Sequence, residues 1–343
     1  MATFHDILSK LADGTTLLAT EAEFAVGELM SGEVDPAQAA GFLMAMRVRG
    51  ETAQEILGGA RALRVRMVPA SAPAGAIDTC GTGGDASGTY NVSTAAAFVL
   101  AGGGAKVAKH GNRSVSSKSG SSDVLAALGV NLDAPLAATE QAIVEVGIGF
   151  LFAPRHHGAM RHVAPVRQSL RLRTLFNLLG PLANPAGVKH QVLGVFSEQW
   201  LMPLAQVLRE LGATSAWVVH GADGLDELST TGTNKIVVLK DDVIIEMSVS
   251  PEEIGLPLAK LSDLVGGDAD ENAKAMMRLL EGEPGAYRDI VLMNAAAGFV
   301  VNGSANGMKD GLAQATTSLD SGNAKAALDG LVRLTNESGT SAP

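Results

Sequence analysis

The first seventy residues carry the apolar spacing of about 3.6 residues that is typical of short amphipathic helices. Such helices have no chemistry of their own, so we expect this region to serve packing, within the chain or against another subunit. The four predicted helices are marked by an apolar stripe (Phe4, Ile7, Leu8, Leu11), by capping boxes at Thr20 with Glu23 and at Thr52 with Glu55, and by Asp35 followed by Pro36.

After a linker at residues 68–75, short apolar runs alternate with helical stretches. Strands are predicted to end at Asp78 and to cover residues 106–108, 148–152, 191–196 and 216–220. Helices are predicted at residues 94–100, 269–280 and 289–301, and a hairpin at residues 235–247. This alternation predicts the α/β class, with a mainly parallel central sheet behind the small N-terminal helical domain.

Composition narrows the classes of function. With 343 residues, 46% hydrophobic and 18% charged, the chain should form a globular protein with an ample core. A net charge of −10 argues against general nucleic-acid binding. The lone cysteine, Cys80, excludes an internal disulfide and fits a reducing compartment. We find no secretory signal and no apolar run near the ~20 residues that span a bilayer, so we expect a cytoplasmic protein with no membrane contact.

Two loops at strand-to-helix junctions are rich in glycine and hydroxyl groups. In the first, Gly81, Gly83 and Gly84 permit conformations that a Cβ forbids and expose N–H groups, just before a helix start that favours anions. Neither the Walker spacing nor the dinucleotide fingerprint is met. The pair of loops suits a ligand with more than one phosphate. The second loop carries a cation, an amide and two hydroxyls: Lys109, Asn112, Ser117 and Ser121.

An acidic pair, Asp226 and Glu227, follows the strand predicted at residues 216–220. An isolated acidic pair is usually a solvated turn, but a position after a strand brings it to the edge where ligands of α/β sheets bind. Mg²⁺ prefers one or two carboxylates together with phosphate and water, and Ser93 offers a hydroxyl nearby. The sequence therefore predicts a magnesium site.

These motifs carry a resemblance that covers most of the chain. The chain resembles the anthranilate phosphoribosyltransferase family in Gly81-Thr82-Gly83-Gly84-Asp85, Asn91-Val92-Ser93-Thr94, Lys109-His110-Gly111-Asn112, Ser119-Gly120-Ser121-Ser122-Asp123-Val124-Leu125, Phe176-Asn177-Leu178-Leu179-Gly180-Pro181-Leu182-Ala183-Asn184-Pro185 and Asp226-Glu227.

The resemblance implies a nucleoside phosphorylase/phosphoribosyltransferase-like fold and a homodimer. It implies transfer of the 5-phosphoribosyl group from phosphoribosyl pyrophosphate to the amine of anthranilate, with Mg²⁺, in tryptophan biosynthesis. It places a helical domain with the dimer contact at residues 1–70, a hinge or helical insertion near 165–190, and the catalytic domain at 75–335.

The resemblance also implies site residues. For phosphoribosyl pyrophosphate they are Gly81, Gly84, Asp85, Thr89, Asn91, Ser93, Thr94, Lys109, Asn112, Ser117 and Ser121. For magnesium they are Ser93, Asp226 and Glu227. For anthranilate they are Gly81, Asn112, His110, His157 and Arg167.

Displacement at C1 of the ribose has oxocarbenium character, so charge stabilisation by Lys109, Asp226 and Glu227 through Mg²⁺ should dominate. An aromatic amine attacks in its neutral form, and we expect no essential general base. The Arg167 guanidinium could pair with the anthranilate carboxylate. The chain departs from the family pattern at Arg171, usually glycine, at Gly158, usually proline, and at Ser122, usually alanine. Arg171 bears on the geometry of the acceptor pocket.

Three rival interpretations stay open at the level of sequence. A pyrimidine-nucleoside phosphorylase shares the implied fold, but the acidic pair favours the transferase. A non-catalytic relative that binds nucleic acid should be basic, and this chain is acidic. Residues 236–243 resemble a strand and acidic pair of type I phosphoribosyltransferases, but the phosphate loop that should follow is absent.

Overall fold

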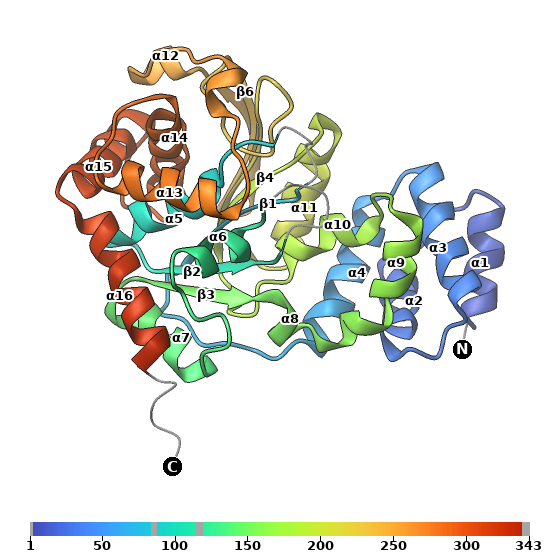
Figure 1. Cartoon of the computed structure of the whole chain (residues 1–343). Helices are drawn as coiled ribbons and strands as arrows, with labels where there is room; N and C mark the ends of the chain where they lie inside the picture. The colour runs from blue at the N-terminus through green and yellow to red at the C-terminus, as the bar shows by residue number, and fades with distance from the viewer. Residues whose placement is uncertain (1–2, 84–87, 114–118, 338–343) are drawn as a thin grey trace.

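The computed structural model describes residues 3–83, 88–113 and 119–337. Figure 1 shows a helical part at the N-terminal end and an α/β part built around a sheet. Among the described residues, no helix has both the length and the apolarity needed to cross a membrane. The helical part comprises α1 (Phe4–Ala12), α2 (Ala19–Ser31), α3 (Pro36–Arg49) and α4 (Ala53–Arg66), joined by the 3-10 turn η1 (Gly158–His162), α9 (Ala164–Leu170) and α10 (Leu175–Leu179).

Two of the predicted helix starts are confirmed by their capping bonds. The Asp35 carboxylate accepts the N–H of Ala37 at 2.8 Å. The Thr52 hydroxyl accepts the N–H of Glu55 at 3.3 Å, and the Glu55 carboxylate returns to the N–H of Thr52 at 2.8 Å. These bonds satisfy N–H groups that a helix start leaves without partners.

The capping box predicted at Thr20 and Glu23 is wrong. Helix α2 begins at Ala19, and the Glu21 carboxylate accepts the N–H of Leu18 at 2.8 Å. Glu21 also forms a salt bridge of 2.7 Å with Lys10 of α1. The capping carboxylate thus takes part in a contact between two helices, which the local pattern cannot reveal.

Within the described residues, seven strands form one sheet in the order β3-β2-β1-β4-β5-β6-β7. The first five strands in this order pair in parallel, whereas β6 pairs antiparallel with both β5 and β7. The predicted mainly parallel sheet and the hairpin are both confirmed. The strands are β1 (Ile77–Gly81), β2 (Val107–Gly111), β3 (Ile148–Phe152), β4 (His190–Gly194), β5 (Ser215–His220), β6 (Asn234–Lys240) and β7 (Val243–Val249).

Three boundaries near the predicted loops differ from expectation. Ile77 starts β1 instead of lying near its end, because every residue up to Gly81 pairs with β4. Lys109 belongs to β2, in which it pairs with Phe150 of β3, and not to the loop that follows β2. The first helix of the α/β part, α5 (Val92–Gly102), begins two residues earlier than predicted. Each shift moves polar residues into regular structure.

The sheet separates two apolar layers, because successive strand residues face opposite sides. Val192 of β4 belongs to one core cluster, together with residues of α5 and α14 (Ala286–Val301), whereas Leu193 belongs to another, together with residues of α11 (Leu201–Glu210) and the N-terminal helices. The helical part and one sheet face thus share a continuous core.

The remaining helices are α6 (Ser121–Ala127), α7 (Leu136–Glu145), α8 (Ala153–His156), α11 (Leu201–Glu210), α12 (Pro251–Ile254), α13 (Ala269–Leu280), α14 (Ala286–Val301), α15 (Met308–Asp320) and α16 (Asn323–Glu337), with short 3-10 turns η2 (Gly180–Leu182), η3 (Glu198–Trp200) and η4 (Leu261–Leu264).

Candidate active site

The turn that follows β1 lies against the acidic loop that follows β5. Gly83, with φ +70°, donates its N–H to Asp226 Oδ2 at 2.6 Å. A Cβ on Gly81 would lie 2.2 Å from the same Oδ2, and a Cβ on Gly194 would lie 1.5 Å from the Asp226 carbonyl oxygen. Glycine at the ends of β1 and β4 is therefore what lets Asp226 approach. Sequence reasoning missed Gly194, because it predicted a strand over residues 191–196 and so placed this glycine inside the strand, whereas β4 ends at Gly194.

The second carboxylate meets the start of a helix. Glu227 Oε1 accepts the N–H of Ser93 at 3.2 Å. Ser93 is the second residue of α5, where N–H groups have no partner within the helix and the helix dipole favours negative charge. The acidic pair thus reaches both phosphate-binding features expected from the sequence, the glycine turn and the helix start.

A single buried cation links these elements. Lys109, only 2% exposed, donates from Nζ to the carbonyl oxygen of Thr79 and lies 3.4 Å from Ser93 Oγ. Asp78, on the neighbouring strand, is fully buried; burial raises the pKa of its carboxyl group, and the charge of Lys109 opposes that rise. The cation therefore lies between the middle of β1 and Ser93, the residue whose N–H binds Glu227.

Asn184 ties Asp78 to the neighbouring strand. It donates from Nδ2 to Asp78 Oδ2 at 2.8 Å and to the carbonyl oxygen of Ala108 at 2.8 Å. The other Asp78 oxygen accepts the N–H of His110 at 3.2 Å. This network joins β1 to β2 and so fixes the strand segment that carries Lys109.

The segment before α5 is held by the C-terminal part of the chain. Thr89 pairs with Val265, and the Asn91 side chain accepts a hydrogen bond of 3.0 Å from Asn272. Thr94, by contrast, is buried inside α5, at 1% exposure. Asn91 thus lies at the N-terminus of α5 and the Thr94 side chain is buried, and the phosphate contacts predicted for Thr89, Asn91 and Thr94 stay predictions.

In the second loop, Ser121 Oγ donates to the carbonyl oxygen of Asn112 at 3.3 Å, and Asn112 Oδ1 accepts the N–H of Arg113 at 2.8 Å. The Ser121 bond brings the start of α6 against Asn112, the residue that follows β2. The other predicted phosphate contacts, Gly84, Asp85 and Ser117, lie outside the described residues.

Two histidines from separate segments meet beside β2. The ring centroids of His110 and His157 are 5.1 Å apart, and both side chains are buried. Burial, the largest cause, lowers the pKa of His110 to about 3 and that of His157 to about 4. Both imidazoles are therefore neutral near pH 7, so this pair of buried rings carries no charge.

Arg167 lies on α9, in the helical part, and its guanidinium stands over the Phe176 ring at 5.6 Å. Burial lowers its pKa, and it is still a cation at neutral pH. Helix α9 ends at Arg171, whose φ of +50° is left-handed. The structure thus joins Lys109, Ser93 and the acidic pair by direct contacts and places Arg167 in the other structural part.

The donor set suits a hard cation. Within the described residues, no cluster combines three or more His, Cys, Asp or Glu side chains. Mg²⁺ needs only one or two carboxylates when phosphate and water complete its shell, and the close packing of Gly81 and Gly83 against Asp226 shapes such a site. Ser93, Asp226 and Glu227 therefore fit Mg²⁺ bound together with a phosphorylated ligand.

Cys80 takes no part in this chemistry. Burial raises the pKa of its thiol well above the ordinary value, and Gln191 Nε2 lies 3.2 Å from Sγ. A protonated thiol is a poor nucleophile, so the residue fills space at the end of β1.

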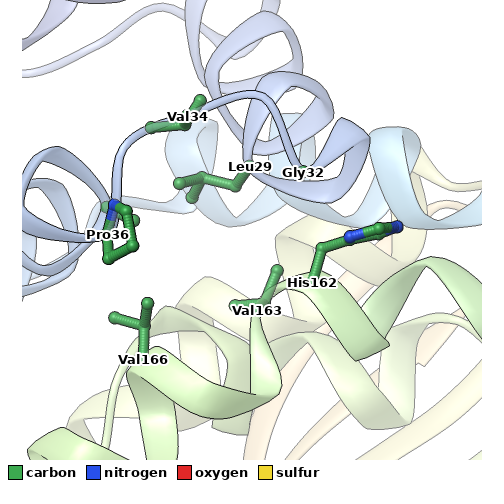
Figure 2. Close-up of a pocket in the computed structure, with 8 residues that line it drawn as sticks. Leu29, Gly32, Val34, Pro36, His162, Val163 and Val166 are labelled. Atoms are coloured by element: carbon green, nitrogen blue, oxygen red, sulfur yellow. The ribbon is translucent and has the colours of Figure 1, made fainter.

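A cavity of about 130 Å³ lies away from this site, between α2, α3 and α9 (Figure 2). His162 is its one titratable side chain, and the ring lies against the turn at Gly32. An apolar wall with a single imidazole lacks the convergent polar groups of a phosphate site. It is lined mainly by Leu29, Val34, Pro36, Val163 and Val166.

Comparisons with known proteins agree with this geometry. Residues 74–325 match the model of the glycosyl transferase family, a/b domain, and residues 5–67 match its helical bundle domain. The chain is 53% identical to an anthranilate phosphoribosyltransferase of Azorhizobium caulinodans (98% of this chain, 97% of that one) and 55% identical to one of Rhodospirillum rubrum (96% and 94%).

Among solved structures, the Thermus thermophilus anthranilate phosphoribosyltransferase superposes with a TM-score of 0.91 at 47% identity (96% of this chain, 99% of that one). The Saccharomyces cerevisiae enzyme in complex with phosphoribosyl pyrophosphate and Mg superposes at 0.90 with 27% identity (97% and 98%). The fold class expected from the sequence is thereby confirmed, and the chain belongs to the anthranilate phosphoribosyltransferase family.

Proposed function

We propose that this protein transfers the 5-phosphoribosyl group from phosphoribosyl pyrophosphate to the amine of anthranilate, releasing pyrophosphate, with Mg²⁺ as cofactor. The observation that carries the proposal is the pair of contacts made by the acidic loop. Asp226 bonds to the glycine turn at 2.6 Å and Glu227 to the start of α5 at 3.2 Å, so carboxylates and phosphate-binding N–H groups share one sheet edge.

The donor side binds charge. Asp226 and Glu227, with the hydroxyl of Ser93, would hold Mg²⁺, which when bound neutralises charge on the pyrophosphate. The positive end of the α5 dipole would orient phosphate oxygens, and Lys109 supplies a fixed cation 3.4 Å from the hydroxyl of Ser93. Groups fixed before the reaction need little rearrangement as charge develops on the leaving group.

The acceptor side binds an aromatic amine. His110 and His157 are neutral, so they line a pocket for a neutral nucleophile without taking its proton. The Arg167 guanidinium would pair with the anthranilate carboxylate. Catalysis then depends on charge stabilisation and on alignment of the amine with C1, not on a general base.

The test follows the loss of anthranilate fluorescence after addition of phosphoribosyl pyrophosphate and Mg²⁺. The unaltered protein should consume anthranilate, and Asp226→Asn should lower turnover about 100-fold or more, the usual scale for losing a charge-stabilising group. No loss of fluorescence with the unaltered protein would remove the transferase assignment. Undiminished turnover of Asp226→Asn would remove the metal role. Phosphate-dependent cleavage of a pyrimidine nucleoside without Mg²⁺ would support the phosphorylase instead.

We also propose that the helical domain, residues 1–70 with the insertion near 165–190, mediates a homodimer beside a catalytic domain of residues 75–335. Large apolar side chains exposed on the helical part support this: Leu18 is 64% exposed, Val48 80% and Val65 75%. Sedimentation equilibrium should give twice the chain mass. A cytoplasmic location, supported by the single cysteine Cys80, is testable by cell fractionation.

A further inference from the structure

The backbone immediately after the acidic pair is bound by a buried asparagine from α14. Asn294 Oδ1 accepts the N–H of Leu228 at 3.0 Å, and its Nδ2 donates to the carbonyl oxygen of Leu228 at 2.8 Å. The same Nδ2 also donates to Ile290 of its own helix at 2.8 Å. Asn294 is 3% exposed within an otherwise apolar stretch of the helix.

The next residue along the loop is bound in the same way by a side chain from the sheet. Asn234, the first residue of β6 and fully buried, accepts the N–H of Ser229 at 2.6 Å through Oδ1. Its Nδ2 donates to the carbonyl oxygen of Ser229 at 2.9 Å and to that of Val249 at 3.1 Å. Two successive residues thus have both backbone groups held by side-chain amides.

Such reciprocal bonds fix the backbone of a residue as a neighbouring strand would, because its N–H donor and its carbonyl acceptor are both engaged. The backbone of the acidic pair itself packs against two glycines. The Asp226 carbonyl oxygen packs on Gly194, and the Glu227 carbonyl oxygen lies 2.8 Å from where a Cβ of Gly221 would stand. The loop is therefore confined between glycine-bordered strand ends and two asparagines.

We propose that Asn294 and Asn234 are positioning residues, which hold the Asp226 and Glu227 carboxylates in the arrangement that binds a divalent cation with phosphoribosyl pyrophosphate. The inference rests on the proposed function, since it assigns the cation to this loop. An amide buried in an apolar helix is costly unless its bonds are made, and Asn294 makes all of its bonds to α14 itself and to the residue that follows the acidic pair.

The experiment measures Mn²⁺ binding to the full chain in the presence of phosphoribosyl pyrophosphate by water-proton relaxation, with thermal unfolding in parallel. The test variants are Asn294→Ala, which removes all three bonds, and Asn294→Asp, which keeps an acceptor for the Leu228 N–H. The matched control is Leu292→Ala, a cavity on the same helix at a buried residue of the apolar core. The control separates loss of stability from loss of metal geometry.

Asn294→Ala and Asn234→Ala should each weaken Mn²⁺ binding about 10- to 100-fold, and raise the Mg²⁺ concentration for half-maximal turnover in step. Leu292→Ala should lower the unfolding temperature and leave Mn²⁺ binding unchanged.

The inference is overturned if the folded asparagine variants bind Mn²⁺ as the unaltered protein does, or if Leu292→Ala weakens binding equally. If Asn294→Ala does not fold, Asn294→Asp and Asn234→Ala decide by the same criterion. Failure of the unaltered protein to bind Mn²⁺ with phosphoribosyl pyrophosphate would count against the proposed function instead.

Discussion

The proposed donor side and the proposed acceptor side of the candidate site are built on opposite principles. On the donor side, ionised groups meet fixed dipoles or hydroxyls: Asp226 meets Gly83, Glu227 meets Ser93, and Lys109 meets Thr79. On the acceptor side the titratable rings of His110 and His157 are kept neutral by burial, and Arg167 rests on an aromatic face.

The difference teaches what each substrate requires. A diphosphate carries several negative charges, and it is bound best by dipoles and cations whose geometry is set in advance. A neutral aromatic amine needs a dry, uncharged wall and alignment with the reacting carbon. Substitutions on the donor side should therefore reduce turnover strongly, whereas those on the acceptor side should change pH dependence or stability with smaller effects on turnover.

The largest effect is expected from Gly194→Ala. Its Cβ would lie 1.5 Å from the Asp226 carbonyl oxygen, so the acidic loop must move. Turnover should fall about 100-fold or more, because small displacements of catalytic groups have effects of that size. The free energy of unfolding should fall by about 1–3 kcal/mol, as overpacking usually causes. Steady-state anthranilate fluorescence and urea unfolding measure the two.

The control is Gly41→Ala on α3, where a Cβ meets nothing within 4 Å. Alanine at an open helical position should leave turnover unchanged and stabilise the fold by up to about 1 kcal/mol. Comparable turnover in Gly194→Ala and Gly41→Ala would contradict the role assigned to the β4 end.

Lys109→Met should give the next largest effect. It removes the buried cation beside the acidic pair while keeping most of the side-chain volume. Loss of one fixed charge near the leaving group should lower kcat about 100-fold. Lys106→Met is the matched control, since Lys106 precedes the same strand and donates to Val144 at an exposed position. Equal kcat values for the two variants would show that the donor side does not depend on this cation.

The parts that could be predicted from sequence are those with local signals. Glycine turns, capping residues and apolar strands located the sheet edge and the acidic pair, since Asp226 lies in the loop that follows β5. What no local pattern encodes is the partner across space. The Glu21 cap of α2 pairs with Lys10, Asp226 packs on Gly194, and Leu228 is bound by Asn294. The apolar surroundings of Asn294 were a visible signal, because a lone buried amide must find partners.

On the acceptor side, the histidines predict a pH dependence of stability. Folded His110 and His157 have pKa values of about 3 and about 4, against 6.5 in the unfolded chain. Between pH 6.5 and about 4 the unfolded chain therefore binds more protons, so stability falls as the pH falls. The slope should approach about 1.4 kcal/mol per pH unit for each ring.

Urea unfolding at a series of pH values measures that slope. His157→Phe should remove about one ring's share of it and lower turnover less than about tenfold, because neither imidazole acts as a base. A slope unchanged by the substitution would show that the folded ring is protonated. A complete loss of turnover with substrate binding intact would assign the ring a proton-transfer role.

The smallest effect concerns Arg171, which ends α9 with a φ of +50° where the family usually has glycine. A left-handed conformation costs an L-residue about 1–2 kcal/mol, and glycine avoids most of that cost at a helix end. Arg171→Gly should therefore raise the free energy of unfolding by about 1 kcal/mol, measured by thermal or urea unfolding. Arg209→Gly, at an exposed position near the end of α11, should have the opposite sign, because glycine there weakens the helix. If both substitutions destabilise the protein, Arg171 makes a contact on the acceptor side that outweighs its backbone strain, and the departure from the family pattern would then be a feature of acceptor binding.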